Sequence, residues 1–186
     1  MEVSLFPVYR KGEKMQRTMS SEELYAYTSQ IKNPSETFEL FLHHYVTGDA
    51  FTRSRENEDV SVWDKLKGNE LELAKQIIFD GLKITPDLSY MRAVSIIKDE
   101  RAIPILKKII ETYPQRFIAE KLFAAKVLYD LTGYKDYIPM LEAACKNRDN
   151  EMLHSYLVYF IDQYIDGLTK NDTRRIMRAL NYHESK

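Results

Sequence analysis

The residue types that most often perform chemistry are sparse in this sequence. His43 and His44 are adjacent, and neighbouring side chains on a helix point about 100° apart, so the pair is poorly placed to share a metal ion. Cys145 is the only cysteine, and it follows two alanines on a predicted apolar helix face, which is typical of an inert buried thiol. We therefore expect no metal site and no cofactor.

Motifs of the common enzyme classes are also missing. The sequence contains no GxxxxGK followed by Ser or Thr, and no GxGxxG, GxSxG, HExxH or CxxC segment. Carboxylate pairs such as Glu70 and Glu72 lie at predicted helix ends or on polar faces, where capping and solvation are expected rather than acid–base work. We predict that the protein is not an enzyme and has no catalytic residues.

Tyrosine is abundant, with 13 residues, and Tyr156, Tyr159 and Tyr164 fall within one predicted helix. The ordinary interpretation is that these rings fill gaps between packed helices. The functional interpretation is a partner surface, because tyrosine is enriched at binding hot spots. Both interpretations stay open at the level of sequence.

Composition favours one soluble, all-helical domain or such a domain with an arm. The chain has 186 residues, of which 44% are apolar and 30% charged, as in globular proteins. Only 6 Gly and 6 Pro argue against a turn-rich β fold. With one cysteine, no apolar run long enough to span a membrane and a polar N-terminus, we expect a cytoplasmic protein without a membrane segment.

The charge pattern argues against nucleic acid as a partner. The formal net charge is −1, and no broad basic surface is indicated. Only the tail is basic, which we interpret as the solvated face of a last helix; its cations are Lys170, Arg174, Arg175, Arg178 and Lys186.

Helical periods of apolar residues organise most of the chain. Short helices are expected after Ser20 and Ser21, and after Ser35, which can cap the second one. Residues 1–20 are expected to form a short strand at 3–8 followed by a loop, or an arm, and residues 49–60 a mobile loop or an internal boundary. Trp63 is expected to anchor the core. Further helices are predicted over residues 71–82, 88–97, 102–113, 117–131, 137–145, 152–165 and 174–180. We divide the chain into an N-terminal arm and helical cap (1–67) and a helical repeat with a C-terminal capping helix (68–186), and we expect both parts to belong to one structural domain.

An internal repeat underlies this organisation. The segment IPIL at residues 103–106 recurs as IPML at residues 138–141, an offset of 35. Similar offsets relate residues 73–78 to 105–110 and residues 91–94 to 122–125. Three helical hairpins are therefore predicted, at about 68–98, 99–134 and 135–167.

Residues 99–106, DERAIPIL, resemble the Asp-Pro-Arg-Ala-Ile-Pro-x-Leu signature of HEAT-like repeats of the phycobilisome-lyase type, with Glu100 at the usual proline. The match is good for the second hairpin, partial for the third and weak for the first. It implies a short α-solenoid of about three HEAT-like hairpins over residues 68–167, in which Arg101 bridges neighbouring hairpins. An ordinary α-bundle is the alternative.

A stack of this kind implies a noncatalytic protein-binding module, such as an adaptor, an inhibitor or an immunity-type protein. Its concave face is lined by the second helix of each hairpin, where the expected contact residues are Arg92, Ser95, Glu120, Lys121, Lys126, His154, Ser155 and Tyr159. The alternatives are a DNA-binding or DNA-repair HEAT-like protein, which the near-neutral charge disfavours, and a lyase-type HEAT-repeat protein.

Overall fold

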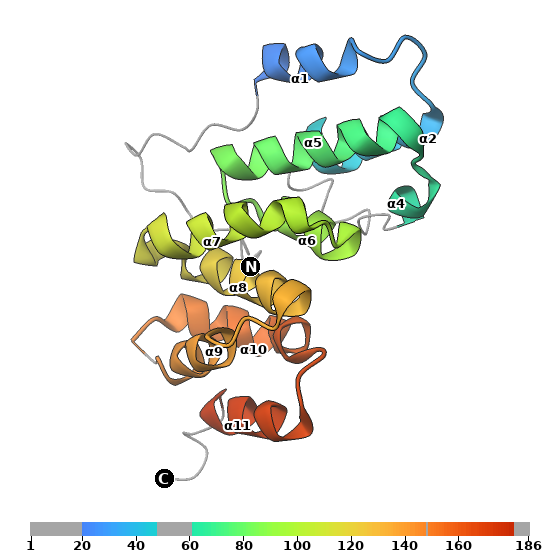
Figure 1. Cartoon of the computed structure of the whole chain (residues 1–186). Helices are drawn as coiled ribbons and strands as arrows, with labels where there is room; N and C mark the ends of the chain where they lie inside the picture. The colour runs from blue at the N-terminus through green and yellow to red at the C-terminus, as the bar shows by residue number, and fades with distance from the viewer. Residues whose placement is uncertain (1–19, 48–60, 148, 181–186) are drawn as a thin grey trace, which may run out of the picture. The chain divides into compact units, whose positions relative to one another are not determined.

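The computed structural model describes residues 20–47, 61–147 and 149–180. Every regular element within these ranges is a helix, and they contain no strand (Figure 1). The all-α prediction is confirmed for this part of the chain. The predicted strand at residues 3–8 and the predicted loop at 49–60 lie outside the described residues.

The described chain forms two compact units, an N-terminal unit that ends at Ile105 and a C-terminal unit that begins at Leu106. The division falls within helix α7 (Ile103–Thr112). The boundary that we placed near residue 67 from the sequence lies inside the N-terminal unit, because helices on both sides of it pack together.

Helices α1 (Ser21–Thr28), α2 (Glu36–Leu42) and α4 (Ser61–Lys65) belong to the N-terminal unit, together with α5 (Gly68–Ile84) and α6 (Leu88–Ile97). A π-helix, η1 (His43–Thr47), continues α2, and a 3-10 turn, η2 (Glu100–Ala102), follows α6. Within this unit α1 and α2 both pack against α5, which in turn packs against α6.

Both predicted serine caps are present in the N-terminal unit. The backbone N–H of Glu23 donates to the Ser20 hydroxyl at 3.2 Å, and the Glu23 carboxylate accepts from the Ser20 N–H at 2.7 Å, which completes a capping box. The Ser35 hydroxyl likewise accepts from the N–H of Phe38 at 3.2 Å. Satisfied N–H groups at these positions explain why α1 and α2 begin there.

Polar contacts hold the first two helices on α5. The Tyr27 hydroxyl donates to Asp80 at 2.5 Å, and burial together with this bond raises the pKa of Tyr27 to about 12. The Ser35 N–H and hydroxyl both donate to the Glu70 carboxylate, at 2.7 and 2.6 Å. Glu70 therefore ties the start of α2 to the first turn of α5.

An aromatic cluster forms the core of the same unit. Phe38, Phe41 and Tyr45 are fully buried, and the Trp63 ring meets that of Phe41 edge to face at 5.3 Å. The indole N–H of Trp63 donates to the Tyr45 hydroxyl at 3.1 Å, so its polar group is satisfied inside the core. The prediction that Trp63 is a core anchor is confirmed.

Arg101 makes the bridging contact that the repeat motif implied. Its guanidinium donates to Asp99 at 2.6 Å and to Glu72 on α5 at 3.0 Å. The ammonium of Lys75 on α5 lies 3.4 Å from the same Asp99 carboxylate oxygen, Oδ2. These ion pairs join the first hairpin to the residues that open the second.

The C-terminal unit contains the rest of α7, the 3-10 turn η3 (Gln115–Phe117), α8 (Ile118–Thr132), α9 (Tyr137–Lys146), α10 (Glu151–Ile165) and α11 (Lys170–Leu180). Within it α8 packs against α9 and α10, and α11 packs against the α9–α10 pair (Figure 1). Ile176 and Leu180 of α11 are buried and Met177 is half-buried. As we predicted, the last helix covers the third hairpin.

The helices of all three predicted hairpins are thus present with bounds close to those read from the sequence. α5 and α6 correspond to the first hairpin, α7 and α8 to the second, and α9 and α10 to the third. Their arrangement as a HEAT-like solenoid stays a prediction.

Candidate functional site

The eight contact residues expected from the sequence fall on three helices. Arg92 and Ser95 lie on α6 in the N-terminal unit. The other six lie on α8 and α10 in the C-terminal unit. Their exposure differs from helix to helix, and this difference decides which of them can meet a partner.

Lys126 on α8 is not the exposed residue that we expected. It is only 5% exposed, and its ammonium donates to both carboxylate oxygens of Asp130, at 2.7 and 2.5 Å. Every residue from Leu122 to Leu128 is buried, so this part of α8 is covered on all sides. A helix covered on all sides leaves its polar position inside the core, where the lysine must be paired.

The remaining candidates on α6 and α8 are half-buried. Lys121 donates to the backbone carbonyl of Tyr113 at 3.2 Å, and Ser95 donates to the carbonyl of Arg92 at 2.7 Å. Glu120 is also half-buried. Lys121 and Ser95 thus hold local structure, and each presents only part of its surface to solvent.

Helix α10 is different, because it carries an exposed apolar face. Tyr159 is 72% exposed, Met152 69% and Val158 53%, and Ser155 is exposed between them. Met152, Ser155 and Tyr159 follow one another at helical spacing, so they form one stripe. We call Met152, Ser155, Val158 and Tyr159 the α10 face. His154, the remaining candidate, is half-buried beside it.

Aromatic rings support the α10 face from beneath. The ring of half-buried Phe160 lies 4.7 Å from that of Tyr159, edge to face, and 4.7 Å from that of Tyr156. Aromatic pairs in this geometry stabilise one another, so Tyr159 is held by its neighbours rather than isolated in solvent.

The opposite side of α10 is core. Tyr164 is fully buried, its ring meets Phe123 of α8 edge to face at 5.9 Å, and burial raises its pKa well above the usual value. Among the described residues its hydroxyl has no hydrogen-bond partner. The interior interpretation of the tyrosines is thus confirmed for Tyr137 and Tyr164, whereas Tyr159 faces solvent and a partner surface there stays a prediction.

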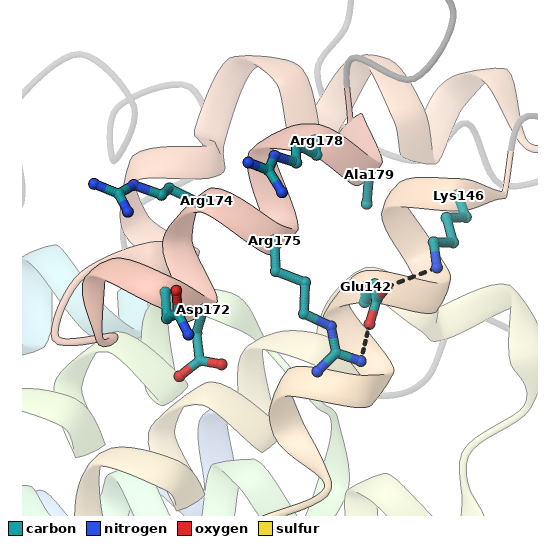
Figure 2. A pocket seen from close by; sticks show the side chains of 8 residues that line it. Glu142, Lys146, Asp172, Arg174, Arg175, Arg178 and Ala179 are labelled. Atoms are coloured by element: carbon teal, nitrogen blue, oxygen red, sulfur yellow. Dashed lines mark hydrogen bonds and ion pairs between the residues drawn. The ribbon is translucent and has the colours of Figure 1, made fainter.

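A second surface of the C-terminal unit is a groove of about 630 Å³ between α9 and α11 (Figure 2). It is lined by Glu142, Lys146, Asn171, Asp172, Arg174, Arg175, Arg178 and Ala179. We interpreted the arginines from the sequence as an ordinary solvated face. The spacing of the arginines on one helix could have indicated that they share a surface. The sequence does not show that residues of α9 lie opposite them and complete the groove.

Within this α9–α11 groove, some charged side chains form ion pairs and others form none among the described residues. Glu142 accepts a hydrogen bond from Lys146 at 2.6 Å and another from Arg175, and these two bonds lower its pKa. Asp172 accepts from the Thr169 hydroxyl at 2.6 Å. In Figure 2 neither Arg174 nor Arg178 reaches Glu142, and both side chains are exposed.

The residue types that often perform chemistry lie apart within the part of the chain that the structure describes. No three side chains of His, Cys, Asp or Glu gather there in a metal-binding arrangement. Cys145 is buried, as expected, and the rings of His43 and His44 lie 5.6 Å apart with only His43 exposed. No described helix has the length and hydropathy needed to cross a membrane.

Comparison with known proteins identified no matching family model, no matching curated protein and no matching solved structure. The resemblance to HEAT-like repeats therefore rests on the sequence motif at residues 99–106 and its repetition.

Proposed function

We propose that this protein is a noncatalytic protein-binding module and that the α10 face is its main contact surface. The supporting observation is that Met152, Val158 and Tyr159 are all more than half exposed on one helix. Single exposed apolar residues are ordinary, but a cluster of large ones on a fixed element is typical of an interface. Tyrosine and methionine are also enriched in interface cores.

The α10 face agrees with the position expected for a binding surface in a HEAT-like stack. α10 is the second helix of the third hairpin, and second helices line the concave face of such stacks. α8, the second helix of the preceding hairpin, contributes less because its middle is buried. Within the proposal, Ser155 and Tyr159 are the predicted contact residues that are exposed, and Met152 and Val158 join them.

A protein partner suits this surface better than nucleic acid does. The exposed side of α10 carries two carboxylates, Glu151 and Asp162, beside its apolar residues. Acidic groups repel a phosphate backbone, whereas a mixed apolar and polar patch is usual between proteins. An adaptor, an inhibitor or an immunity-type protein of the cytoplasm would use such a surface without turnover.

The test is affinity capture of partners from the native cell followed by mass spectrometry. The bait is the full chain, compared with Met152→Ser/Tyr159→Ser and with the matched control Tyr25→Ser/Leu40→Ser, which removes exposed apolar residues from α1 and α2. Loss of hot-spot side chains should raise the dissociation constant of the captured partner by about 30-fold or more. The control variant should leave this constant unchanged.

Two results would contradict the proposal. The first is a partner that binds the Met152→Ser/Tyr159→Ser variant as tightly as the original chain. The second is a purified protein that turns over a substrate and loses that activity when one side chain is removed.

A further inference from the structure

The α9–α11 groove carries more positive than negative charge. Its lining contains four cationic side chains, Lys146, Arg174, Arg175 and Arg178, and two carboxylates, Glu142 and Asp172, which leaves a formal excess of two positive charges (four minus two). The excess is local, because the whole chain has a net charge of −1.

Existing ion pairs show which cations make up this excess. Lys146 and Arg175 both bind Glu142, whose side chain is 14% exposed, so these two cations share one carboxylate. Asp172 is held at the first turn of α11 by Thr169, whose hydroxyl also accepts from the Asp172 N–H at 3.2 Å. Within the described residues, neither Arg174 nor Arg178 has a carboxylate at ion-pair distance.

Arg174 and Arg178 are also positioned to act together. They are four residues apart on α11, which places them on one side of the helix, and their side chains extend in the same direction in Figure 2. The helix itself is fixed because Ile176 and Leu180 are buried on its other side. Two guanidinium groups on a fixed helix can each donate a pair of hydrogen bonds to a carboxylate.

We propose that the α9–α11 groove binds an acidic peptide segment of a protein partner, with one carboxylate on Arg174 and another on Arg178. This goes beyond the α10 face, because it assigns a second surface and the charge of what binds there. Charge complementarity selects the occupant, since the groove of about 630 Å³ offers two guanidinium groups that have no carboxylate partner among the described residues.

Nucleic acid fits the same groove less well. A nucleic-acid strand carries a phosphate every few ångströms and needs cations along its whole path. Here the lining has four cations, of which Lys146 and Arg175 already bind Glu142, and a second carboxylate, Asp172, lies in the same lining. A peptide with two carboxylates about one helical turn apart matches this short arrangement.

The experiment measures binding of a fluorescein-labelled peptide in which Glu alternates with Gly, by fluorescence anisotropy with the full chain at low salt. Arg174→Gln/Arg178→Gln should raise the dissociation constant for this peptide by about tenfold or more, because two charge-assisted pairs are lost. The matched control is Lys107→Gln/Lys108→Gln, which removes two exposed cations of α7 and gives the same net charge. Its dissociation constant should stay within about twofold of the original, and the Gln–Gly version of the peptide should not bind.

A third variant, Arg174→Lys/Arg178→Lys, keeps both charges and removes the paired donors. Intermediate weakening is expected, since an ammonium ion is a point charge without the planar fork. This variant also serves if the glutamine variant fails to fold.

Three results would overturn the inference. Binding that is unchanged in both arginine variants would exclude the groove. Equal weakening in the lysine control would show only general charge attraction. Tighter binding of oligothymidylate of matched length, measured in competition with the Glu peptide, would assign the groove to nucleic acid. None of these results affects the capture experiment on the α10 face, so the two proposals fail separately.

Discussion

The hydroxyl of Tyr137 on α9 donates a hydrogen bond of 2.5 Å to the backbone carbonyl of Tyr164 in the last turn of α10. Carbonyls in the last turn of a helix have no amide partner within it. The N–H of Leu168, which would pair with Tyr164 in a longer helix, donates to Ile165 instead. The phenol therefore satisfies a buried carbonyl and ties α10 to α9.

Replacement of this phenol by Tyr137→Phe should destabilise the fold. The ring still fills the core, but the Tyr164 carbonyl loses its donor, which costs about 1–2 kcal/mol. Urea unfolding followed by circular dichroism measures the change. Tyr159→Phe removes a hydroxyl from an exposed ring and should alter the free energy of unfolding by less than about 0.5 kcal/mol. Equal effects of the two substitutions would mean that the bond contributes nothing.

A charge reversal at Lys126 should be much more harmful than one at an exposed lysine of the same unit. Lys126→Glu places a second carboxylate beside Asp130 in a nearly closed site and should cost about 2–4 kcal/mol. Lys126→Met, which keeps the length and leaves Asp130 partly solvated, should cost about 1 kcal/mol. Lys107→Glu on α7 is the exposed comparison. Equal falls in melting temperature for Lys126→Glu and Lys107→Glu would contradict the burial of Lys126.

Gly81 in α5 should resist replacement by alanine, although alanine is the better helix former. A Cβ atom at this position would lie 2.4 Å from Cε2 of Tyr90 on α6. Propensity favours alanine by about 1 kcal/mol, whereas overpacking of a core costs about 1–3 kcal/mol, so a net loss of stability is expected. In the Tyr90→Ala background the ring is gone, and Gly81→Ala should become neutral or stabilising. If Gly81→Ala stabilised the original chain, α5 and α6 would have to be farther apart at this position than the 2.4 Å approach to Tyr90 implies.

Acid should weaken the ion pairs around Asp99. Hydrogen bonds from the Arg101 side chain, and then from its backbone N–H, hold the pKa of Asp99 well below its usual value of 3.8. A carboxylate whose folded pKa is depressed contributes stability above its unfolded pKa and loses it as pH falls toward the folded pKa. Asp99→Asn should therefore lower stability at pH 7 by about 0.5–1 kcal/mol, because Arg101 is half exposed and solvent screens the pair.

The same substitution should change stability little near pH 2. At that pH Asp99 is protonated in the unfolded state, so most of the stability that its depressed pKa contributes is lost. Stability measured by urea unfolding across this range tests the expectation. Glu100→Gln, at the exposed neighbouring carboxylate, is the control and should not show this narrowing. A difference between Asp99→Asn and the original chain that does not change with pH would contradict the assigned ion pairs.

Helix positions and their caps were predictable because their signals are local. The serine at position 20 and the glutamate three residues later satisfy each other's backbone groups within one turn, and Ser35 caps α2 alone. Arg101 was also predictable, since the motif at residues 99–106 placed it between hairpins and its partner Asp99 is two residues away. Each of these contacts depends on residues close in the chain or on a motif that repeats.

The sequence by itself thus determined the helical character and approximate helix bounds of the described residues, and the burial of Trp63 and Cys145. Only the tertiary structure decided which polar residues are covered. Lys126 was predicted to be a surface lysine because the sequence of α8 does not show that α9 and α10 pack against this helix. Glu142 binds Arg175 as well as Lys146 because α9 lies against α11, whereas Arg174 and Arg178 have no carboxylate at ion-pair distance among the described residues. Burial and charge compensation depend on atoms from distant segments, and those segments meet only when the helices pack.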